Sequence, residues 1–154
     1  MKVFLGGTCN NSTWRDSLIA MLNDDVEYFN PVVEECTPES RVEEIRQRNE
    51  CEISLYVITS EMKGVYSIAE LIEDCHNKRG KTFFCFLEEG FNAGQIRSLC
   101  AVGNMVERHS SWWFDTLEEV ASHVNIVGKK SYCPITRRGY ISNLFYRFKN
   151  IIGG

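Results

Sequence analysis

The sequence predicts a single α/β domain, and three observations favour that class. The 154 residues are 44% hydrophobic and 25% charged, a composition typical of one globular domain with a substantial core. Short runs rich in β-branched and aromatic residues alternate five times with segments of helical periodicity. The links between these segments are short. Such alternation is typical of a parallel sheet with helices on both faces.

The first strand and helix are expected within residues 2–22. Lys2 to Leu5 is a short apolar run, and Gly6 and Gly7 end it. Thr13 and Asp16 have the spacing of a capping box, which marks the start of a helix. The apolar positions of that helix are Leu18, Ile19, Met21 and Leu22.

The second and third units repeat this order. Val26 to Phe29 is the second apolar run, and a charged helix is predicted from Pro38 with Val42 and Ile45 as its apolar stripe. Ile53 to Thr59 is β-branched or aromatic at nearly every position, as expected for a central strand covered on both faces. The third helix is expected to have a core stripe of Val65, Ile68, Ala69, Ile72 and Cys75.

The last units complete a five-stranded sheet. Thr82 to Leu87 is a fourth buried strand, and a fourth helix is marked by Ile96, Leu99 and Cys100. Met105 to Phe114 is a weaker fifth strand, and Leu117 to Val124 a fifth helix. We therefore predict a flavodoxin-like (Rossmann-like) three-layer sandwich with a parallel sheet in the order 2-1-3-4-5. Ligands of such sheets bind beyond the carboxyl ends of the strands, here in the loops after Leu5, Phe29, Thr59 and Leu87.

Charge divides the chain into an acidic body and a basic tail. The net charge of −4 argues against a protein whose whole surface binds nucleic acid. Six of the 17 basic residues and none of the 21 acidic ones lie in 129–154, so residues 1–128 carry 11 basic against 21 acidic groups, or −10. We expect a domain over residues 1–127 and a basic tail over 128–154. The tail is predicted to hold a basic amphipathic helix with the apolar stripe Ile141, Leu144, Phe145, Phe148 and Ile152.

The tail helix has several candidate partners. The simplest is the acidic body of this domain or a second subunit. A basic amphipathic helix also suits an anionic membrane, an acidic partner protein or nucleic acid. No nucleic acid is expected to bind the core domain.

The location expected from the sequence is the cytoplasm. Seven cysteines are an odd number, are widely spread and form no C-x-x-C pair, which indicates reduced thiols. The start MKVFLGG has an apolar run too short for a signal peptide, and no stretch approaches the roughly 18 apolar residues of a membrane span. His76, His109 and His123 lack metal-site spacing, so no metal is expected.

The loop GGTCNNSTWRD after the first strand is a candidate ligand site. Its glycines let the backbone approach a ligand, and the next helix offers free N–H groups to a phosphate or a sugar hydroxyl; a plain tight turn is the alternative. The chain has neither G-x-x-x-x-G-K-[ST] nor G-x-G-x-x-G. ATP chemistry and NAD(P) dehydrogenase chemistry therefore lose their main support, and no cofactor is expected.

Glu70 is the candidate catalytic residue, in SEMKGVYSIAELIED after the third strand. If the helix starts near Gly64, Glu70 lies off the core stripe, beside Tyr66 and Ser67, and faces the cleft. The helix dipole would keep this carboxylate ionised, and the two hydroxyls can fix its rotamer. Such a glutamate can attack an anomeric carbon in glycosyl transfer or hydrolysis. From periodicity alone, the alternative is a solvated surface glutamate.

Four strings carry a family resemblance: GGTCNNSTWRD, YFNPVVEE followed by TPE, LYVIT, and EMKGVYSIAE. Together they resemble the nucleoside 2-deoxyribosyltransferase-like family, specifically its short bacterial and viral branch, over roughly the first 125 residues. The resemblance implies a flavodoxin-like fold. It also implies cleavage of the N-glycosidic bond of a 2′-deoxynucleoside, with the deoxyribose passed to another base. Some relatives are glycosidases of deoxynucleoside 5′-monophosphates.

The resemblance also implies roles for individual residues. The family's glycine and nucleophilic glutamate on the helix after strand three match Gly64 and Glu70, and a covalent deoxyribosyl ester on Glu70 would pass to a base or to water. The matching substrate-binding positions are Gly6, Gly7, Thr8, Asn10, Asn30 and Pro31. Arg15, beside the first loop, is a candidate for binding a 5′-phosphate or a carboxylate; a helix-surface salt bridge to Asp16 or another acid is the alternative.

Two positions depart from the family pattern. Glu52 precedes LYVIT where aspartate is usual, and Ser60 stands where proline is common. Both leave the candidate nucleophile in place. Two alternatives stay open: a catalytically silent nucleotide-binding or interaction module, and an N-glycosidase acting on another ribosyl donor such as NAD. The resemblance further implies a homo-oligomer, because deoxyribosyltransferase subunits complete one another's sites.

Overall fold

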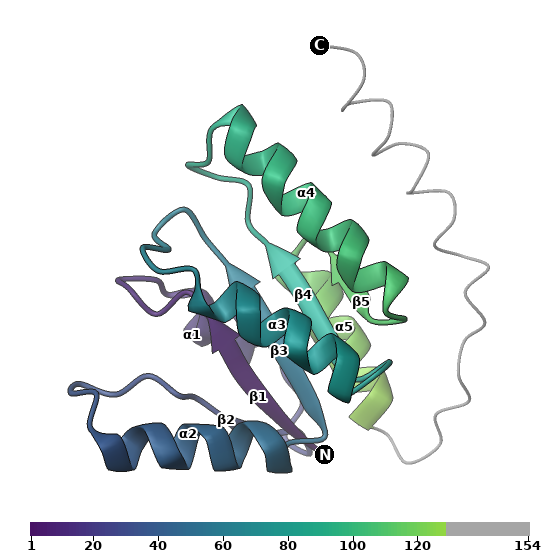
Figure 1. The fold of residues 1–154 in the computed structure, drawn as a ribbon. Helices are drawn as coiled ribbons and strands as arrows, with labels where there is room; N and C mark the ends of the chain where they lie inside the picture. The colour runs from purple at the N-terminus through teal and green to yellow at the C-terminus, as the bar shows by residue number, and fades with distance from the viewer. Residues whose placement is uncertain (129–154) are drawn as a thin grey trace.

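The computed structural model describes residues 1–128, in which five parallel strands form one sheet in the order β2-β1-β3-β4-β5 (Figure 1). The predicted flavodoxin-like fold and strand order are therefore confirmed. The predicted amphipathic helix of the tail lies outside the described residues. No helix within residues 1–128 has the length and apolar character needed to cross a membrane.

Strands and helices alternate along the described chain. The strands are β1 (Lys2–Gly7), β2 (Glu27–Phe29), β3 (Ile53–Ile58), β4 (Thr82–Phe86) and β5 (Trp112–Phe114). The helices are α1 (Trp14–Ile19), α2 (Pro38–Glu50), α3 (Tyr66–Asn77), α4 (Ala93–Arg108) and α5 (Leu117–Gly128). Helices α2, α3 and α4 cover one face of the sheet, and α1 and α5 cover the other (Figure 1).

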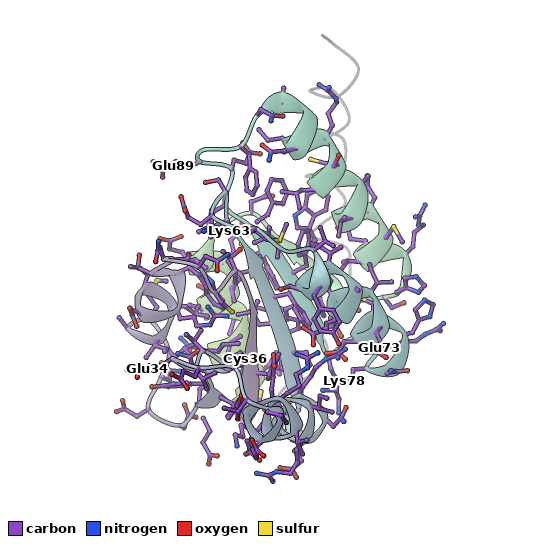
Figure 2. All side chains as sticks on the ribbon, turned by 60° about the vertical axis from the view of Figure 1, so that its left-hand side comes forward. Glu34, Cys36, Lys63, Glu73, Lys78 and Glu89 are labelled. Carbon is purple, nitrogen blue, oxygen red and sulfur yellow. The ribbon has the colours of Figure 1, made fainter. Side chains whose placement is uncertain are left out.

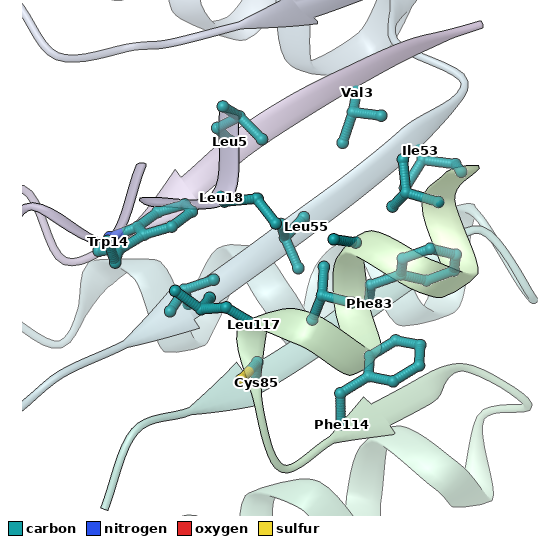
Figure 3. Packing of buried hydrophobic residues seen from close by; sticks show 14 of the residues in the cluster. Val3, Leu5, Trp14, Leu18, Ile53, Leu55, Phe83, Cys85, Phe114 and Leu117 are labelled. Atoms are coloured by element: carbon teal, nitrogen blue, oxygen red, sulfur yellow. The ribbon is translucent and has the colours of Figure 1, made fainter. Parts of the chain in front are cut away.

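The strands feed two hydrophobic cores because their side chains alternate between the two faces. Toward α1 and α5, Leu5, Leu55 and Phe83 pack with Leu18 and Phe114 (Figure 3). The core toward α3 and α4 contains Phe4, Tyr56, Ile58, Leu71 and Phe84. All six residues of β3 are buried, which confirms the predicted central strand.

The boundaries of α1 and β5 differ from the prediction. Thr13 is the N-cap residue of α1, but its side chain makes no capping hydrogen bond, so the predicted capping box is wrong. Residues 105–108 of the predicted fifth strand belong to α4, and β5 is only three residues long. The reason is that Val106 continues the buried helical stripe of α4 that begins at Leu99.

Helix α2 turns its apolar positions outward. Val42 is 67% exposed and Ile45 is 44% exposed, so the apolar stripe predicted for this helix is wrong. The side chains that α2 buries are those of Gln47 and Arg48. Arg48 finds an ionic partner on α3, which replaces hydrophobic packing at this side of the helix.

The core stripe of α3 is only partly as predicted. The helix begins at Tyr66, and both Val65 and Ala69 are exposed, so these two positions are wrong. The stripe is centred one turn further along and consists of Ile68, Leu71, Ile72 and Cys75. Glu70 and Asp74 lie next to it and are buried as well.

Gly7 ends β1 in a backbone conformation that other residues rarely adopt. Its φ is +112°, and a Cβ atom there would lie 2.0 Å from the carbonyl oxygen of Val57. At Gly64, a Cβ atom would meet nothing within 4 Å. The two glycines therefore form a matched pair, one constrained and one open.

We expect Gly7→Ala to lower the free energy of unfolding by about 2 kcal/mol or more, because both the backbone strain and the overlap with β3 must be relieved. Gly64→Ala should change it by less than about 0.5 kcal/mol. Urea unfolding of the two variants and the wild type checks this. Equal stability of the two variants would contradict the constraint at Gly7.

Candidate active site

The carboxyl ends of β1 and β3 bring two loops together. The backbone N–H of Thr8 donates to the carbonyl of Val57 at 2.9 Å, and the Thr8 hydroxyl accepts from the N–H of Thr59 at 2.9 Å. Asn10 Nδ2 donates to the carbonyl of Glu61 at 3.3 Å. The predicted binding loop after β1 is thus tied to the segment that leads into α3.

Gly6 and Gly7 are needed for this close approach. A Cβ atom on Gly6 would lie 2.8 Å from the ring of Tyr56, and one on Gly7 would overlap the backbone of β3. The two glycines therefore have a packing role in addition to the predicted one in ligand binding.

Arg15 lies beneath the first loop and is 3% exposed. Its Nε donates to the carbonyl of Leu5 at 3.0 Å, and its Nη1 to the carbonyl of Thr8 at 2.7 Å. The guanidinium also lies over the ring of Trp14, at 4.3 Å from the ring centroid. The structure thus gives Arg15 backbone carbonyls as partners, in place of the predicted phosphate or acidic side chain. Its role here is to hold the loop.

The other predicted binding positions lie in exposed loops. Asn30 Oδ1 accepts from the N–H of Val32 at 3.1 Å, which forms a local turn. Phe29, the last residue of β2, pairs with Phe4, three residues before β1 ends at Gly7. The loop with Asn30 and Pro31 therefore begins about 10 Å nearer the amino end of β1 than the loop that follows β1. Gly64 is exposed just before α3.

Glu70 is buried at 5% exposure, so the alternative of a solvated surface glutamate is wrong. Its Oε1 lies 3.5 Å from Nη2 of Arg41 and 3.6 Å from Nη1 of Arg48. Both are ion-pair distances that are too long for hydrogen bonds, and Oε1 has no hydrogen-bond partner among the described residues. The carboxylate is therefore close to positive charge while this oxygen keeps its lone pairs unshared.

Burial raises the pKa of Glu70 above its ordinary value. Arg48 and Arg41 oppose the shift, whereas Glu44 and Asp74 add to it. Burial thus acts against the ionised form that the helix dipole is predicted to favour. Carboxylates with a raised pKa are common at catalytic sites.

Tyr66 and Ser67 have partners other than the Glu70 carboxylate. The Ser67 hydroxyl donates to the carbonyl of Gly7 at 3.4 Å, which joins the start of α3 to the end of β1. The ring of Tyr66 lies beneath the guanidinium of Arg41, at 4.5 Å. The groups that lie at ion-pair distance from the Glu70 carboxylate are instead two arginines of α2.

Three buried residues that the sequence analysis missed lie behind Glu70. Arg48 contacts Asp74 with two nitrogens, Nη2 to Oδ1 at 2.7 Å and Nε to Oδ2 at 3.2 Å. The hydroxyl of Tyr56 donates to Asp74 Oδ2 at 2.8 Å. Two signals could have found them: Asp74 is one helical turn after Glu70, and a tyrosine inside a fully buried strand needs a hydrogen-bond partner.

The end of α2 is held by Lys78, at the C-terminal end of α3 near Glu73 (Figure 2). Its Nζ donates to the carbonyl of Arg48 and, at 3.0 Å, to the hydroxyl of Ser54. These contacts fix the backbone that carries Arg48. Within residues 1–128, no group of three or more His, Cys, Asp or Glu side chains is arranged to hold a metal ion.

Comparison with known families agrees with the geometry. Residues 1–91 match the sequence model of a family described as nucleoside 2-deoxyribosyltransferase like. The match covers more than half of the chain and includes β1 to β4 and Glu70. No curated protein matches the chain.

We expect Glu70→Gln to raise the free energy of unfolding at pH 7 by about 1 kcal/mol, because it removes a buried charge that lacks hydrogen bonds. The pKa of Glu70 is raised in the folded state. The stability of the wild type therefore falls as the pH rises from the unfolded-state pKa through the folded-state pKa, and it stays lowered above that range. The gain should therefore vanish below about pH 4.

Urea unfolding across this pH range checks the expectation. Glu118→Gln, at an exposed position of α5, is the matched control and should show no such pH-dependent gain. A Glu70→Gln variant that is less stable than wild type at pH 7 would contradict the effect of burial.

Proposed function

The chain belongs to the nucleoside 2-deoxyribosyltransferase-like family, and we propose that it cleaves the N-glycosidic bond of a 2′-deoxynucleoside or its 5′-monophosphate. The deoxyribosyl group would pass to another base or to water. One observation carries the proposal: a buried carboxylate oxygen on Glu70, without a hydrogen-bond partner among the described residues, in the helix that follows the central strand.

The proposed reaction has two displacement steps. The carboxylate of Glu70 attacks the anomeric carbon as the bond from that carbon to the base nitrogen breaks, and the base leaves with the bonding electron pair and takes up a proton. The product is a deoxyribosyl ester of Glu70, formed through an oxocarbenium-like transition state. A nitrogen of a second base, or water, then attacks the same carbon, loses a proton and frees the carboxylate.

The surroundings of Glu70 suit this role. A nucleophile must be ionised, and Arg41 and Arg48 favour the ionised form against the effect of burial. Hydrogen bonds would draw electron density from the carboxylate and weaken it as a nucleophile, and Oε1 accepts none from the described residues. The hydrogen bond from Ser67 to Gly7 places this part of α3 beside the loop after β1, where the substrate is proposed to bind.

We further propose that the enzyme needs no cofactor and acts as a homo-oligomer in the cytoplasm. The support for the oligomer is that several large apolar side chains are exposed and would lose contact with water in an interface. They include Val42 and Ile45 on α2, and Val65 and Tyr66 at the start of α3.

A second candidate is a nucleotide-binding module without turnover. The observation that favours it is the pair of guanidiniums beside Glu70, because buried ion pairs also occur in purely structural roles. The experiment below separates the two.

We expect release or exchange of bases when the wild type is incubated with deoxynucleosides and their 5′-monophosphates, with and without a free acceptor base. Glu70→Ala should abolish turnover, with a loss of at least about 10⁴-fold, because no covalent ester can form. Chromatography of the bases measures both outcomes and shows whether a base or water is the acceptor. NAD in the same panel tests the other ribosyl donor.

Glu118→Gln serves as the control, since this acidic residue lies on α5, on the opposite face of the sheet. It should keep wild-type turnover. Binding of these ligands without any turnover would overturn the enzymatic proposal in favour of the binding module.

A further inference from the structure

Helix α2 presents a charged face to the protein interior. Arg48 is 7% exposed, whereas Val42 and Ile45 of the same helix face outward. Burying a guanidinium costs desolvation free energy, whereas burying an apolar side chain does not. Close ionic and hydrogen-bonding partners can offset that cost. Arg48 has such partners on α3, where its Nη2 lies 2.7 Å from Asp74 and 2.8 Å from Glu73.

Asp74 fixes the guanidinium plane of Arg48. The two-nitrogen contact between them uses both carboxylate oxygens of Asp74, at 2.7 and 3.2 Å. The hydroxyl of Tyr56, from the central strand, donates to the same carboxylate at 2.8 Å. Because β3 is buried throughout, this hydroxyl provides a rigid anchor for the pair.

The fixed guanidinium contacts Glu70 in two ways. Nη2 of Arg48 donates to the backbone carbonyl of Glu70 at 2.9 Å. Nη1, which Asp74 does not use, lies 3.6 Å from Oε1 of Glu70. The guanidinium therefore pairs with Asp74 through two nitrogens and leaves Nη1 facing Glu70 at more than hydrogen-bond distance.

We infer that Arg48 is a positioning residue for Glu70, held by Asp74 and Tyr56 at a distance that favours the carboxylate charge without a hydrogen bond to Oε1. The inference rests on the proposed function of Glu70 as the nucleophile. It goes further by assigning the state of that nucleophile to a restrained arginine on a different helix.

The arrangement predicts opposite effects for its two charged members. Removing Arg48 leaves two buried carboxylates, Glu70 and Asp74, without their shared cation. Removing the charge of Asp74 takes away a neighbouring anion and frees Arg48 to pair closely with Glu70. The first change should raise the pKa of Glu70 and the second should lower it.

Other charged and titratable groups also surround Glu70, and they stay unchanged in these variants. They are Arg41 and Glu44 on α2, Tyr66 and Glu73 on α3, and Tyr56 on β3. Because this set is constant, a difference in sign between the two variants reports on the Arg48–Asp74 pair.

The test follows the side-chain carboxyl carbon of Glu70 by NMR in protein labelled with ¹³C-glutamate, with the signal assigned by its loss in Glu70→Gln. We expect the pKa of Glu70 to rise in Arg48→Gln and to fall in Asp74→Asn. Arg46→Gln, at an exposed arginine two residues earlier on α2, is the control and should leave it unchanged. Shifts of the same sign in both variants, or no shift in either, would overturn the inference.

Activity supplies a second readout. Arg48→Gln and Asp74→Asn should each lose about tenfold or more in kcat/KM. The acidic limb of the pH profile should move to higher pH in Arg48→Gln and to lower pH in Asp74→Asn. Arg48→Lys keeps the charge but not the planar guanidinium. In this variant the pKa of Glu70 should lie closer to the wild-type value than in Arg48→Gln, while kcat stays low. Full recovery of kcat with lysine would contradict positioning. If Arg48→Gln does not fold, Asp74→Asn and Arg48→Lys carry the test.

The two readouts separate the inference from the proposed function. Absence of turnover in the wild type would remove the proposed function, while the NMR titration would still decide whether Arg48 and Asp74 set the charge of Glu70.

Discussion

The buried ion pair between Arg48 and Asp74 determines how α2 meets α3, and the candidate site depends on it. Helix α2 contributes no apolar stripe to the core, because Val42 and Ile45 face outward, so charged contacts supply its specific attachment. A buried pair of this kind adds little net stability compared with apolar packing, but breaking it by removing one partner costs about 3–5 kcal/mol. Its contribution is to fix one orientation of α2, and with it the arginine beside Glu70.

The two faces of the sheet support different parts of the site, each through a buried arginine. On the α1 face, Arg15 holds the loop after β1 through the carbonyls of Leu5 and Thr8. On the α3 face, Arg48 contacts Glu70. The start of α3 meets the end of β1 through the hydrogen bond from Ser67 to Gly7, at the carboxyl edge where parallel sheets of this fold bind ligands. Neither arginine is free to act as a substrate clamp, and both act on the geometry of other groups.

The sequence predicted the sheet well because strand signals are local. Every residue of β3 is apolar, aromatic or small, and its neighbours in the strand order follow from topological rules. The prediction from sequence failed at α2. Periodicity assigns apolar residues to the core and does not recognise a charged face that is turned inward. Helical spacing and family resemblance both pointed to Glu70, but neither predicted its ion pairs, since Arg41 and Arg48 come from α2. Arg48 and Asp74 are 26 positions apart, beyond any local pattern.

The outward face of α2 follows from the same constraint. At about 100° per residue, Ile45 and Val42 lie about 60° and 120° around α2 from Arg48, and both are exposed while Arg48 is buried against α3. Their exposure therefore depends on the orientation that the charge pairing gives to α2. An apolar surface created in this way gains free energy when a partner covers it. Hence the ionic contact beside Glu70 and the exposed apolar residues belong to the same helix, and a change that rotates α2 would alter both.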